Sequence, residues 1–286
     1  MAKRYIVFKR QVSEIKDIEE MAKALEKIAA ANVHYLNITS QKMKEYDKEI
    51  KRILCNVGAR TLFHPLFRQK RGKKLNVLLT SEKGLCGPLL NKLLDFFDLK
   101  TKKEDKILVI GKKGEELLRE RGRKTDYFFP AQKEIPQKED IKRIEKLIIS
   151  QFLTERVSEV VIFYPSFESL AVQNPSAFTL LPIEERKFRE ETGEIKEVEG
   201  LPIYEPNRKQ ILDYLIKEYL GLVFYQVILE TKLSELSART VAMEEAGENA
   251  QKLIKQITLK YFREKREQTT KSINDLYSHH KIFQTI

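Results

Sequence analysis

One stretch of this chain has the residue types of a phosphate-binding loop. The segment GLCGPLLN at residues 84–91 stands between an apolar run and an amphipathic run, where nucleotide-binding α/β proteins hold phosphate. Neither GxGxxG nor GxxxxGK[ST] is present, and Pro88 lacks one of the backbone amides that a phosphate would use. A tight turn between a strand and a helix explains these glycines better. We therefore expect no bound cofactor.

Cys86, inside this turn, could in principle be a reactive thiol, because a helix N-terminus favours the thiolate. No histidine lies nearby in sequence to act as its base, so we expect a small packed side chain instead. Cys55 is the second of two cysteines, which provide neither a disulfide framework nor the spacing of metal ligands. This cysteine content fits a reducing compartment.

Histidines and paired carboxylates are the remaining candidates for acid–base or metal chemistry. The histidines form no HExxH motif, and the paired carboxylates lie in a highly charged stretch. We therefore expect no catalytic residue and no metal site in this chain. The residues considered are His34, His64, His279 and His280, and Glu184, Glu185, Glu190 and Glu191.

The elements around these residues are dominated by a heptad repeat at the front of the chain. Eleven of its thirteen a and d positions are apolar. Such a seam buries completely only against another long helix that winds round it. The a positions are Ile15, Ala22, Ala29, Leu36, Met43, Ile50 and Val57, and the d positions are Ile18, Leu25, Asn32, Thr39, Tyr46 and Ile53.

A second heptad repeat occupies residues 212–261, with twelve of fifteen positions apolar. No proline occurs before Pro65 or after Pro206, so neither segment contains the residue that most reliably breaks a helix. We expect each helix to be roughly 70 to 80 Å long. The two ends of the chain are therefore predicted to pair as an antiparallel coiled coil. Two separate amphipathic helices on a globular core are the alternative.

Between these helices the sequence alternates between short apolar runs and amphipathic stretches. This order is typical of a parallel sheet with helices on its faces. We predict strands at residues 75–80, 107–110, 126–129 and 160–164, and helices at PLLNKLLDFF, 112–121 and about 137–153. A further strand is expected at AFTLLPI, a hairpin or loop at ETGEIKEVEG, and the start of the second long helix at Asn207.

The predicted organisation has three parts: residues 1–73 form the N-terminal helix and a connector, 74–206 an α/β domain, and 207–286 the C-terminal helix. The hydrophobic content of 42% is enough for a core. No stretch approaches the roughly 18 apolar residues of a membrane span, and the N-terminus does not have the apolar region of a signal peptide. Membrane association would then have to come through a partner.

Positive charge is concentrated at the front of the chain. Residues 1–74 carry 18 Lys and Arg against 8 Asp and Glu, and the net charge of the whole chain is +11. This excess predicts an acidic partner. A coiled-coil arm that binds nucleic acid is one alternative, and it predicts strongly salt-dependent binding. The absence of tryptophan, and of exposed aromatics among the basic residues, weakens it.

Three segments carry a family resemblance. SELSARTVAMEEAGENA at 234–250 is similar to a pattern of Ser-Glu, Ala-Arg, Ala-Met, Ala and Asn-Ala at matching spacing. TSEKGLCGPLLN at 80–91 resembles T-S-D/E-R/K-G-L-C-G-G-F-N, and MAKALEKIAAAN at 21–32 resembles I-T-K-A-M-x-M-V-A-A-A-K. Together, and in this order, they resemble the γ subunit of F-type ATP synthases. The matching turn residues are Gly84, Leu85, Cys86, Gly87 and Asn91.

The resemblance implies an antiparallel coiled coil from both termini with a Rossmann-like α/β domain inserted between them. It implies a non-catalytic rotor shaft inside a ring of three α and three β subunits, with ATP made on β. The α/β domain and the lower end of the coil would stand on the c-subunit ring beside the ε subunit. Such a chain is a peripheral protein on the inner face of an energy-transducing membrane, the cytoplasmic side in bacteria, and no nucleic acid is expected.

The resemblance also implies which side chains contact the catalytic ring. These are Lys23, Leu25, Arg239, Lys265, Arg266 and Thr270. We expect Arg239 and Lys265 to point outward, so that their alanine variants weaken coupling more than they destabilise the coil. The sequence departs from the family pattern at Pro88, Ser272, His279 and His280. A nucleotide-dependent enzyme built on the α/β domain is the other alternative, and it predicts nucleotide binding by the isolated chain.

Overall fold

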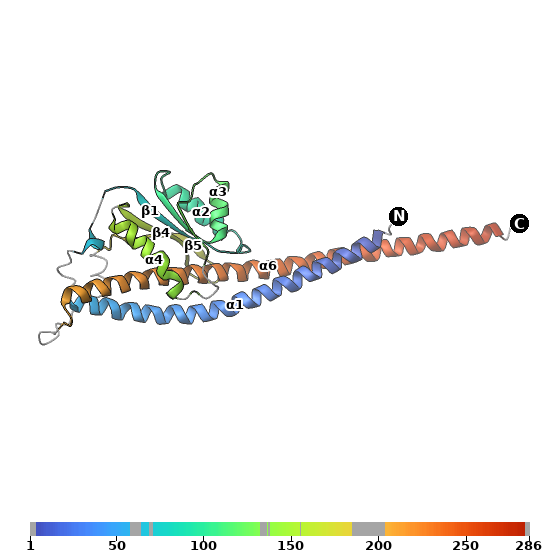
Figure 1. The fold of residues 1–286 in the computed structure, drawn as a ribbon. Coiled ribbons are helices and arrows are strands. Elements are labelled where there is room, and N and C mark those ends of the chain that lie inside the picture. Colours follow the sequence, from blue (N-terminus) through green and yellow to red (C-terminus); the bar gives the residue numbers. More distant parts are fainter. Residues whose placement is uncertain are drawn as a thin grey trace. The chain divides into compact units, whose positions relative to one another are not determined.

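Two long helices open and close the chain. The computed structural model describes residues 4–57, 64–68, 71–131, 136, 138–154, 156–184 and 204–283. Helix α1, Arg4–Val57, has 54 residues and helix α6, Arg208–Phe283, has 76 (Figure 1). These lengths correspond to about 80 Å and about 115 Å. The expected length is therefore too short for α6, because this helix continues more than twenty residues past the predicted heptad.

Helix α6 begins one residue after the position predicted from sequence. Asn207 Oδ1 accepts a hydrogen bond from the backbone amide of Gln210 at 2.9 Å. This bond satisfies one of the free amides of the first turn, which is why asparagine is a favoured N-cap. At the same end, Arg208 Nε donates to the carbonyl oxygen of Val57, the last residue of α1, at 2.7 Å.

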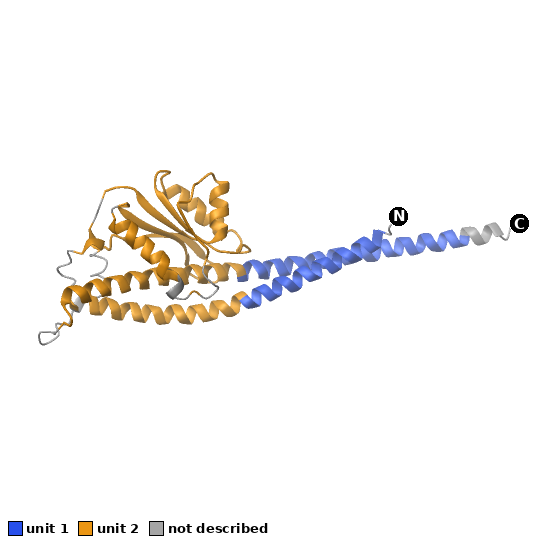
Figure 2. Ribbon diagram, viewed as in Figure 1, with its two compact units in different colours: residues 1–28, 240–286 blue, residues 29–239 orange. Residues whose placement is uncertain are grey.

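The chain divides into two compact units. Unit 1 comprises Met1–Ile28 and Thr240–Ile286, and unit 2 comprises Ala29–Arg239 (Figure 2). In unit 1, the ring of Tyr5 packs edge to face against Tyr261, with centroids 6.1 Å apart. Further along α1, Glu19 Oε1 accepts a hydrogen bond from Gln251 Nε2 at 2.8 Å. The residue numbers rise along α1 as they fall along α6, so the helices run antiparallel in this unit.

The same pairing holds within unit 2. Gln226 Nε2 donates to the carbonyl oxygen of Met43 at 3.1 Å. Together with the Arg208–Val57 bond, this fixes an antiparallel direction for α1 and α6 in this unit too. The interface is apolar, and its buried members are Ala29, Leu36, Leu229, Leu233 and Leu236. The prediction that the two ends of the chain pair is confirmed.

The seam of α1 is rotated from the predicted one. The predicted a stripe is largely buried, with Ala22, Ala29, Leu36, Ile50 and Val57 among its members. In the predicted d stripe, however, Ile18, Tyr46 and Ile53 are 56, 48 and 43% exposed. The prediction that the d stripe lies in the seam is therefore wrong at these three positions, whereas Leu25, Asn32 and Thr39 are half-buried.

A different stripe completes the seam of α1. It lies four residues after each a position and is buried or half-buried at Glu19, Glu26, Val33, Ser40, Asp47 and Leu54. Two of its polar members have bonding partners: Glu19 accepts from Gln251, and Asp47 Oδ2 pairs with Lys51 at 2.7 Å. A pattern based on apolarity misses such positions, because a satisfied polar group can be buried at moderate cost.

The middle of the chain forms a five-stranded sheet of order β3-β2-β1-β4-β5. The strands are β1 (Lys74–Leu79), β2 (Lys106–Ile110), β3 (Tyr127–Phe129), β4 (Glu159–Phe167) and β5 (Gln173–Leu181). Four of them are parallel as predicted, whereas β5 is antiparallel to β4. The connection of residues 168–172 is too short for a crossover, so it makes a hairpin.

Helices cover both faces of the sheet (Figure 1). Helices α2 (Leu89–Lys100) and α3 (Lys112–Glu120) pack on one face around Phe97. Helix α4 (Lys138–Leu153) packs on the other face, in the same core cluster as Phe224 of α6 and Leu54 of α1. A short 3₁₀ helix, Pro65–Phe67, adds the buried Leu66 to this cluster. The α/β domain is therefore built directly onto the helix pair within unit 2.

The boundaries of the three predicted parts stay a prediction. Residues 58–63 and 185–203, and with them the segment ETGEIKEVEG, lie outside the described residues. Within the described part of the chain, every helix is too short or too polar to cross a membrane.

Candidate functional site: the glycine turn and helix α6

The predicted contact residues of α1 lie in unit 1. The side chain of Lys23 is 49% exposed, and its Nζ pairs with Glu19 Oε1 at 2.5 Å. Leu25 is half-buried. The Lys23 ammonium, followed by the amide of Gln251, holds the pKa of Glu19 below its ordinary value. Lys23 is thus oriented by its own helix while its side chain stays accessible.

The contact residues predicted near the end of α6 are also accessible. Lys265, Arg266 and Thr270 are exposed. The Nζ atom of Lys265 lies 5.8 Å from the ring centroid of Tyr261, within cation–π range. The outward orientation expected for Lys265 is confirmed. Its contact with a catalytic ring stays a prediction.

Arg239 does not point outward. It is 7% exposed, and its Nη2 atom donates to Glu235 Oε1 at 2.7 Å and to the carbonyl oxygen of Gly84 at 3.3 Å. The expected orientation is therefore wrong for this residue. The glycine turn packs onto α6 here, and the sequence of α6 alone gives no sign of an element more than 150 residues away.

Glu235 is flanked by a second cation. Lys232 Nζ lies 3.0 Å from Glu235 Oε2, so each carboxylate oxygen pairs with one cation. The side chains of Lys232, Glu235 and Arg239 are 8, 6 and 9% exposed. The spacing of three and four residues places them on one side of α6 and could be read from sequence. Their burial could not.

The glycine turn itself has an unusual backbone. Leu85 has φ 67° and Gly87 has φ 56°, both in the left-handed region. Leu85 is 61% exposed, whereas Cys86 is 2% exposed and packs with Leu89 and Leu90. Pro88 stands just before α2, where its missing amide leaves no helical bond unmade. The turn closes tightly at the start of α2, as its glycines predict, and Asn91 is exposed.

Burial raises the pKa of the Cys86 thiol above its ordinary value, and the charge of Glu235 raises it further. This environment disfavours the thiolate, which is the nucleophilic form of cysteine. Cys86 is packed, as expected.

A close contact at the ends of β1 and β2 was not foreseen from sequence. Thr80 Oγ1 donates to the carbonyl oxygen of Ile110 at 2.8 Å, and the side chain of Thr80 packs against Gly111 and Gly114. The end of β1 is thus packed tightly against the start of α3. The two closely spaced glycines at the start of α3 were the feature of the sequence that could have indicated this close contact.

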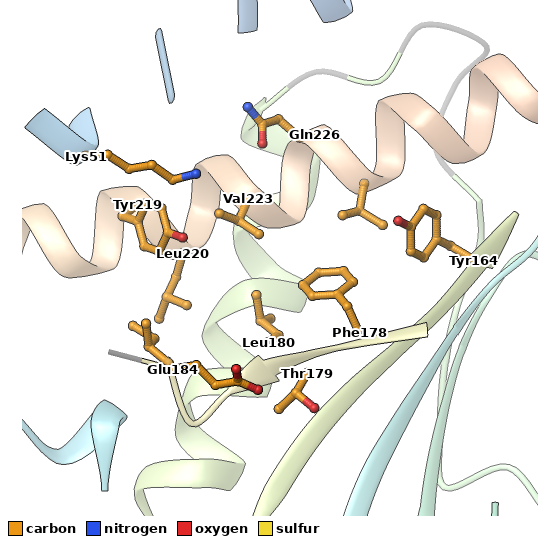
Figure 3. A pocket seen from close by; sticks show the side chains of 12 residues that line it. Lys51, Tyr164, Phe178, Thr179, Leu180, Glu184, Tyr219, Leu220, Val223 and Gln226 are labelled. Atoms are coloured by element: carbon orange, nitrogen blue, oxygen red, sulfur yellow. The ribbon is translucent and has the colours of Figure 1, made fainter. Parts of the chain in front are cut away.

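A pocket of about 340 Å³ lies between β5 and α6 in unit 2 (Figure 3). Phe178, Leu220 and Val223 provide apolar walls, and Lys51 and Glu184 bring opposite charges. Lys51 pairs with Asp47 and its Nζ lies 5.8 Å from the ring centroid of Tyr219. The volume is at the small end for ligand pockets, and the lining is formally neutral.

Tyr164 at the end of this pocket gives a pH prediction (Figure 3). Burial, with a smaller effect of the Glu230 charge, raises its pKa to about 12 from 10.0. Because the folded-state pKa is the higher one, the stabilisation is complete below pH 10 and is lost as the pH rises towards 12. Chemical denaturation of Tyr164→Phe at pH 9 to 11.5 should show a weaker pH dependence than the wild type. An equal pH dependence of stability in the variant and the wild type would contradict the raised pKa of Tyr164.

The histidines and carboxylates form no candidate metal site among the described residues. No group of three or more His, Cys, Asp or Glu side chains in this part of the chain could hold a metal ion. His64 Nε2 lies 2.8 Å from Asp213 Oδ1, which ties the 3₁₀ helix to α6. Glu185, Glu190 and Glu191, and the side chains of His279 and His280, lie outside the described part.

Solved structures share this arrangement. A chain of the Euglena gracilis mitochondrial ATP synthase OSCP/F1/c-ring assembly aligns with a TM-score of 0.69 at 15% identity, covering 99% of this chain and 95% of that one. A chain of the Tetrahymena thermophila mitochondrial ATP synthase central stalk and c-ring aligns with a TM-score of 0.58 at 20% identity, covering 79% and 99%. The fold is thus of the class found in the central stalks of rotary ATP synthases.

Sequence relatives then give the family. The family model described as ATP synthase matches residues 6–279. The ATP synthase gamma chain of Halothermothrix orenii is 32% identical, with 94% of this chain and 95% of the relative covered. That of Alkaliphilus metalliredigens is 28% identical with the same coverage. This chain belongs to the ATP synthase gamma chain family.

Proposed function

We propose that this chain is the central rotor shaft of a proton-translocating F-type ATP synthase. The shaft couples rotation of the membrane c ring to conformational changes at the catalytic β subunits. The observation that carries the proposal is the antiparallel pairing of α1 and α6 in a chain of the gamma family. A pair of long helices with small residues at close contacts, such as Ala22 and Ala29, resists twisting and so transmits torque.

An exposed apolar stripe on α1 supports contact with the surrounding ring. Large apolar side chains that monomers rarely leave in water mark surfaces for protein partners. We propose that this stripe, with Leu25 on the same side of the helix, faces the α and β subunits. Lys23 lies on another side of α1, beside Glu19, and its contact with the ring is proposed separately. Its members, 43 to 64% exposed, are Ile18, Met21, Ile28, Tyr35, Ile38, Tyr46 and Ile53.

The end of α6 has a similar character. Leu259, Phe262 and Leu276 are 71, 50 and 70% exposed, in the same stretch of helix as the exposed Lys265, Arg266 and Thr270. We assign this stretch to the interior of the catalytic ring. ATP chemistry takes place on the β subunits, and this chain contributes no catalytic residue. The α/β domain and the adjoining ends of α1 and α6 contact the c ring and the ε subunit, so the chain is peripheral on the inner, cytoplasmic face of the membrane.

Reconstitution tests the proposal. The α, β and ε subunits of the same organism are assembled with and without this chain and combined with membranes that contain the c ring. We expect the chain to copurify with α and β, and ATP-driven ion translocation to appear only when it is present. Lys252→Ala, at a 69% exposed side chain, serves as a control that keeps full activity. Equal translocation in both samples would remove the proposal.

The isolated chain tests the alternatives. A nucleic-acid-binding arm requires strongly salt-dependent binding of DNA or RNA. An enzyme on the α/β domain requires that the chain alone bind or turn over a nucleotide. We expect neither, and either result would favour that alternative over the shaft.

A further inference from the structure

We infer that Lys232, Glu235 and Arg239 form a clamp that fixes the glycine turn, residues 84–87, to the shaft helix α6. Through the bond between Arg239 and the Gly84 carbonyl, this clamp passes twist in α6 to the α/β domain. The inference rests on the proposed rotor function. It makes Arg239 a positioning residue that acts inside this chain, in addition to any contact with a partner.

The charge arrangement makes the clamp rigid. Glu235 receives Arg239 on one carboxylate oxygen at 2.7 Å and Lys232 on the other at 3.0 Å. All three side chains are at least nine-tenths buried, so water screens their attraction little. The Arg239 guanidinium is thereby held in one orientation, with Nη2 also 3.3 Å from the Gly84 oxygen. A free surface arginine would sample many rotamers instead.

The backbone of the glycine turn is strained and therefore needs stabilising contacts. Leu85 has φ 67°, a conformation disfavoured for a residue with a branched side chain, and it leaves 61% of that side chain in water. Two contacts with neighbouring residues of α6 stabilise the turn. Arg239 binds the Gly84 carbonyl, and Ala238 packs in the cluster of Cys86, Leu89 and Leu90.

The connection of the turn to strand β1 explains how a force on the turn would reach the rest of the sheet. Residues 84–87 connect β1 to α2, and β1 is the central strand, bonded to β2 on one side and β4 on the other. A displacement of the turn therefore reaches both halves of the sheet. A contact on β3 or β5, the edge strands, would reach one neighbour only.

The test compares Glu235→Gln and Arg239→Lys with Glu248→Gln. Glu248 forms an i,i+4 pair with Lys252 on the same helix, but these side chains are 64 and 69% exposed. Hydrogen exchange of the full chain is measured at the amides of residues 81–92. We expect exchange there to rise about ten-fold in the two clamp variants, while amides of β4 change little. Glu248→Gln should match the wild type.

The same variants are then assembled with the ring subunits. We expect both clamp variants to copurify with α and β and to hydrolyse ATP, but to translocate several-fold fewer ions per ATP. A further variant, Arg239→Gln, removes the charge as well as the planar fork. It should therefore lose more coupling than Arg239→Lys, which keeps the charge. If the wild-type chain fails to assemble, the proposed function fails, whereas the exchange measurement still reports on the clamp.

Two results would overturn the clamp. Lost coupling with unchanged exchange at residues 81–92 would mean that Arg239 acts on a partner and not on the turn. Raised exchange with coupling equal to that of Glu248→Gln would mean that the cluster only stabilises the fold.

Discussion

Leu36→Asp should destabilise the chain more than any other single change in the helix pair. Leu36 is 0% exposed and lies in the cluster that joins α1 to α6 in unit 2. The substitution removes a buried leucine, worth about 2 to 5 kcal/mol, and adds an uncompensated carboxylate. We expect a loss of at least about 4 kcal/mol in the free energy of unfolding, measured by urea denaturation followed by circular dichroism.

Tyr35→Asp is the matched control for this change. Tyr35 is the preceding residue of the same helix but is 52% exposed. The same new charge there should cost less than about 1 kcal/mol. If both variants lost the same stability, the assignment of the seam in α1 would be incorrect.

Gly114→Ala should have the second largest effect. A Cβ atom at Gly114 would lie 2.8 Å from the Cβ of Thr80, too close for two carbon atoms. Thr80 has little room to move, because its hydroxyl donates to the carbonyl of Ile110 and the residue is 3% exposed. Helix α3 must therefore shift off the sheet, and we expect a loss of about 2 to 4 kcal/mol, measured by thermal and urea unfolding.

Gly247→Ala in α6 provides the contrast. A Cβ atom there would meet no atom within 4 Å. Alanine is the better helix former by about 1 kcal/mol, so this variant should be more stable than the wild type. A Gly114→Ala variant as stable as the wild type would mean that α3 does not pack on Thr80 as described.

The sequence predicts much of this fold for identifiable physical reasons. Runs of β-branched and aliphatic residues, such as VLL in β1 and ILVI in β2, mark buried parallel strands to within one residue. Asn207 is recognisable as an N-cap, and the seam of α6 is confirmed at Met243 and Ala250, which are 7 and 5% exposed. Local signals therefore suffice for elements whose stability is local or whose burial is complete.

Two errors have a common cause. Ile18 and Tyr46 of the predicted d stripe of α1 are exposed, while Glu19 and Asp47 are half-buried. Arg239 is buried although a shaft surface predicts an exposed cation. Polar side chains are buried where another segment of the chain satisfies their hydrogen bonds. Apolar side chains stay exposed in the isolated chain where we expect another subunit to cover them. One-dimensional patterns contain neither piece of information.

The residues predicted to contact the catalytic ring were identified from the family resemblance alone. Lys23, Lys265 and Thr270 are accessible, which permits contact with a ring of partner subunits. The clamp around Glu235 needed coordinates, because Gly84 and Arg239 are 155 residues apart.

Direct observation of rotation tests the central claim. The ring of α and β subunits is fixed to a surface, and a probe particle is attached to the α/β domain of this chain through an added tag. On addition of ATP, we expect sustained rotation of the particle in one direction, which stops when ATP is exhausted. ATP hydrolysis by the same assemblies with the particle stationary, or moving only at random, would contradict the assignment of this chain as the rotor shaft.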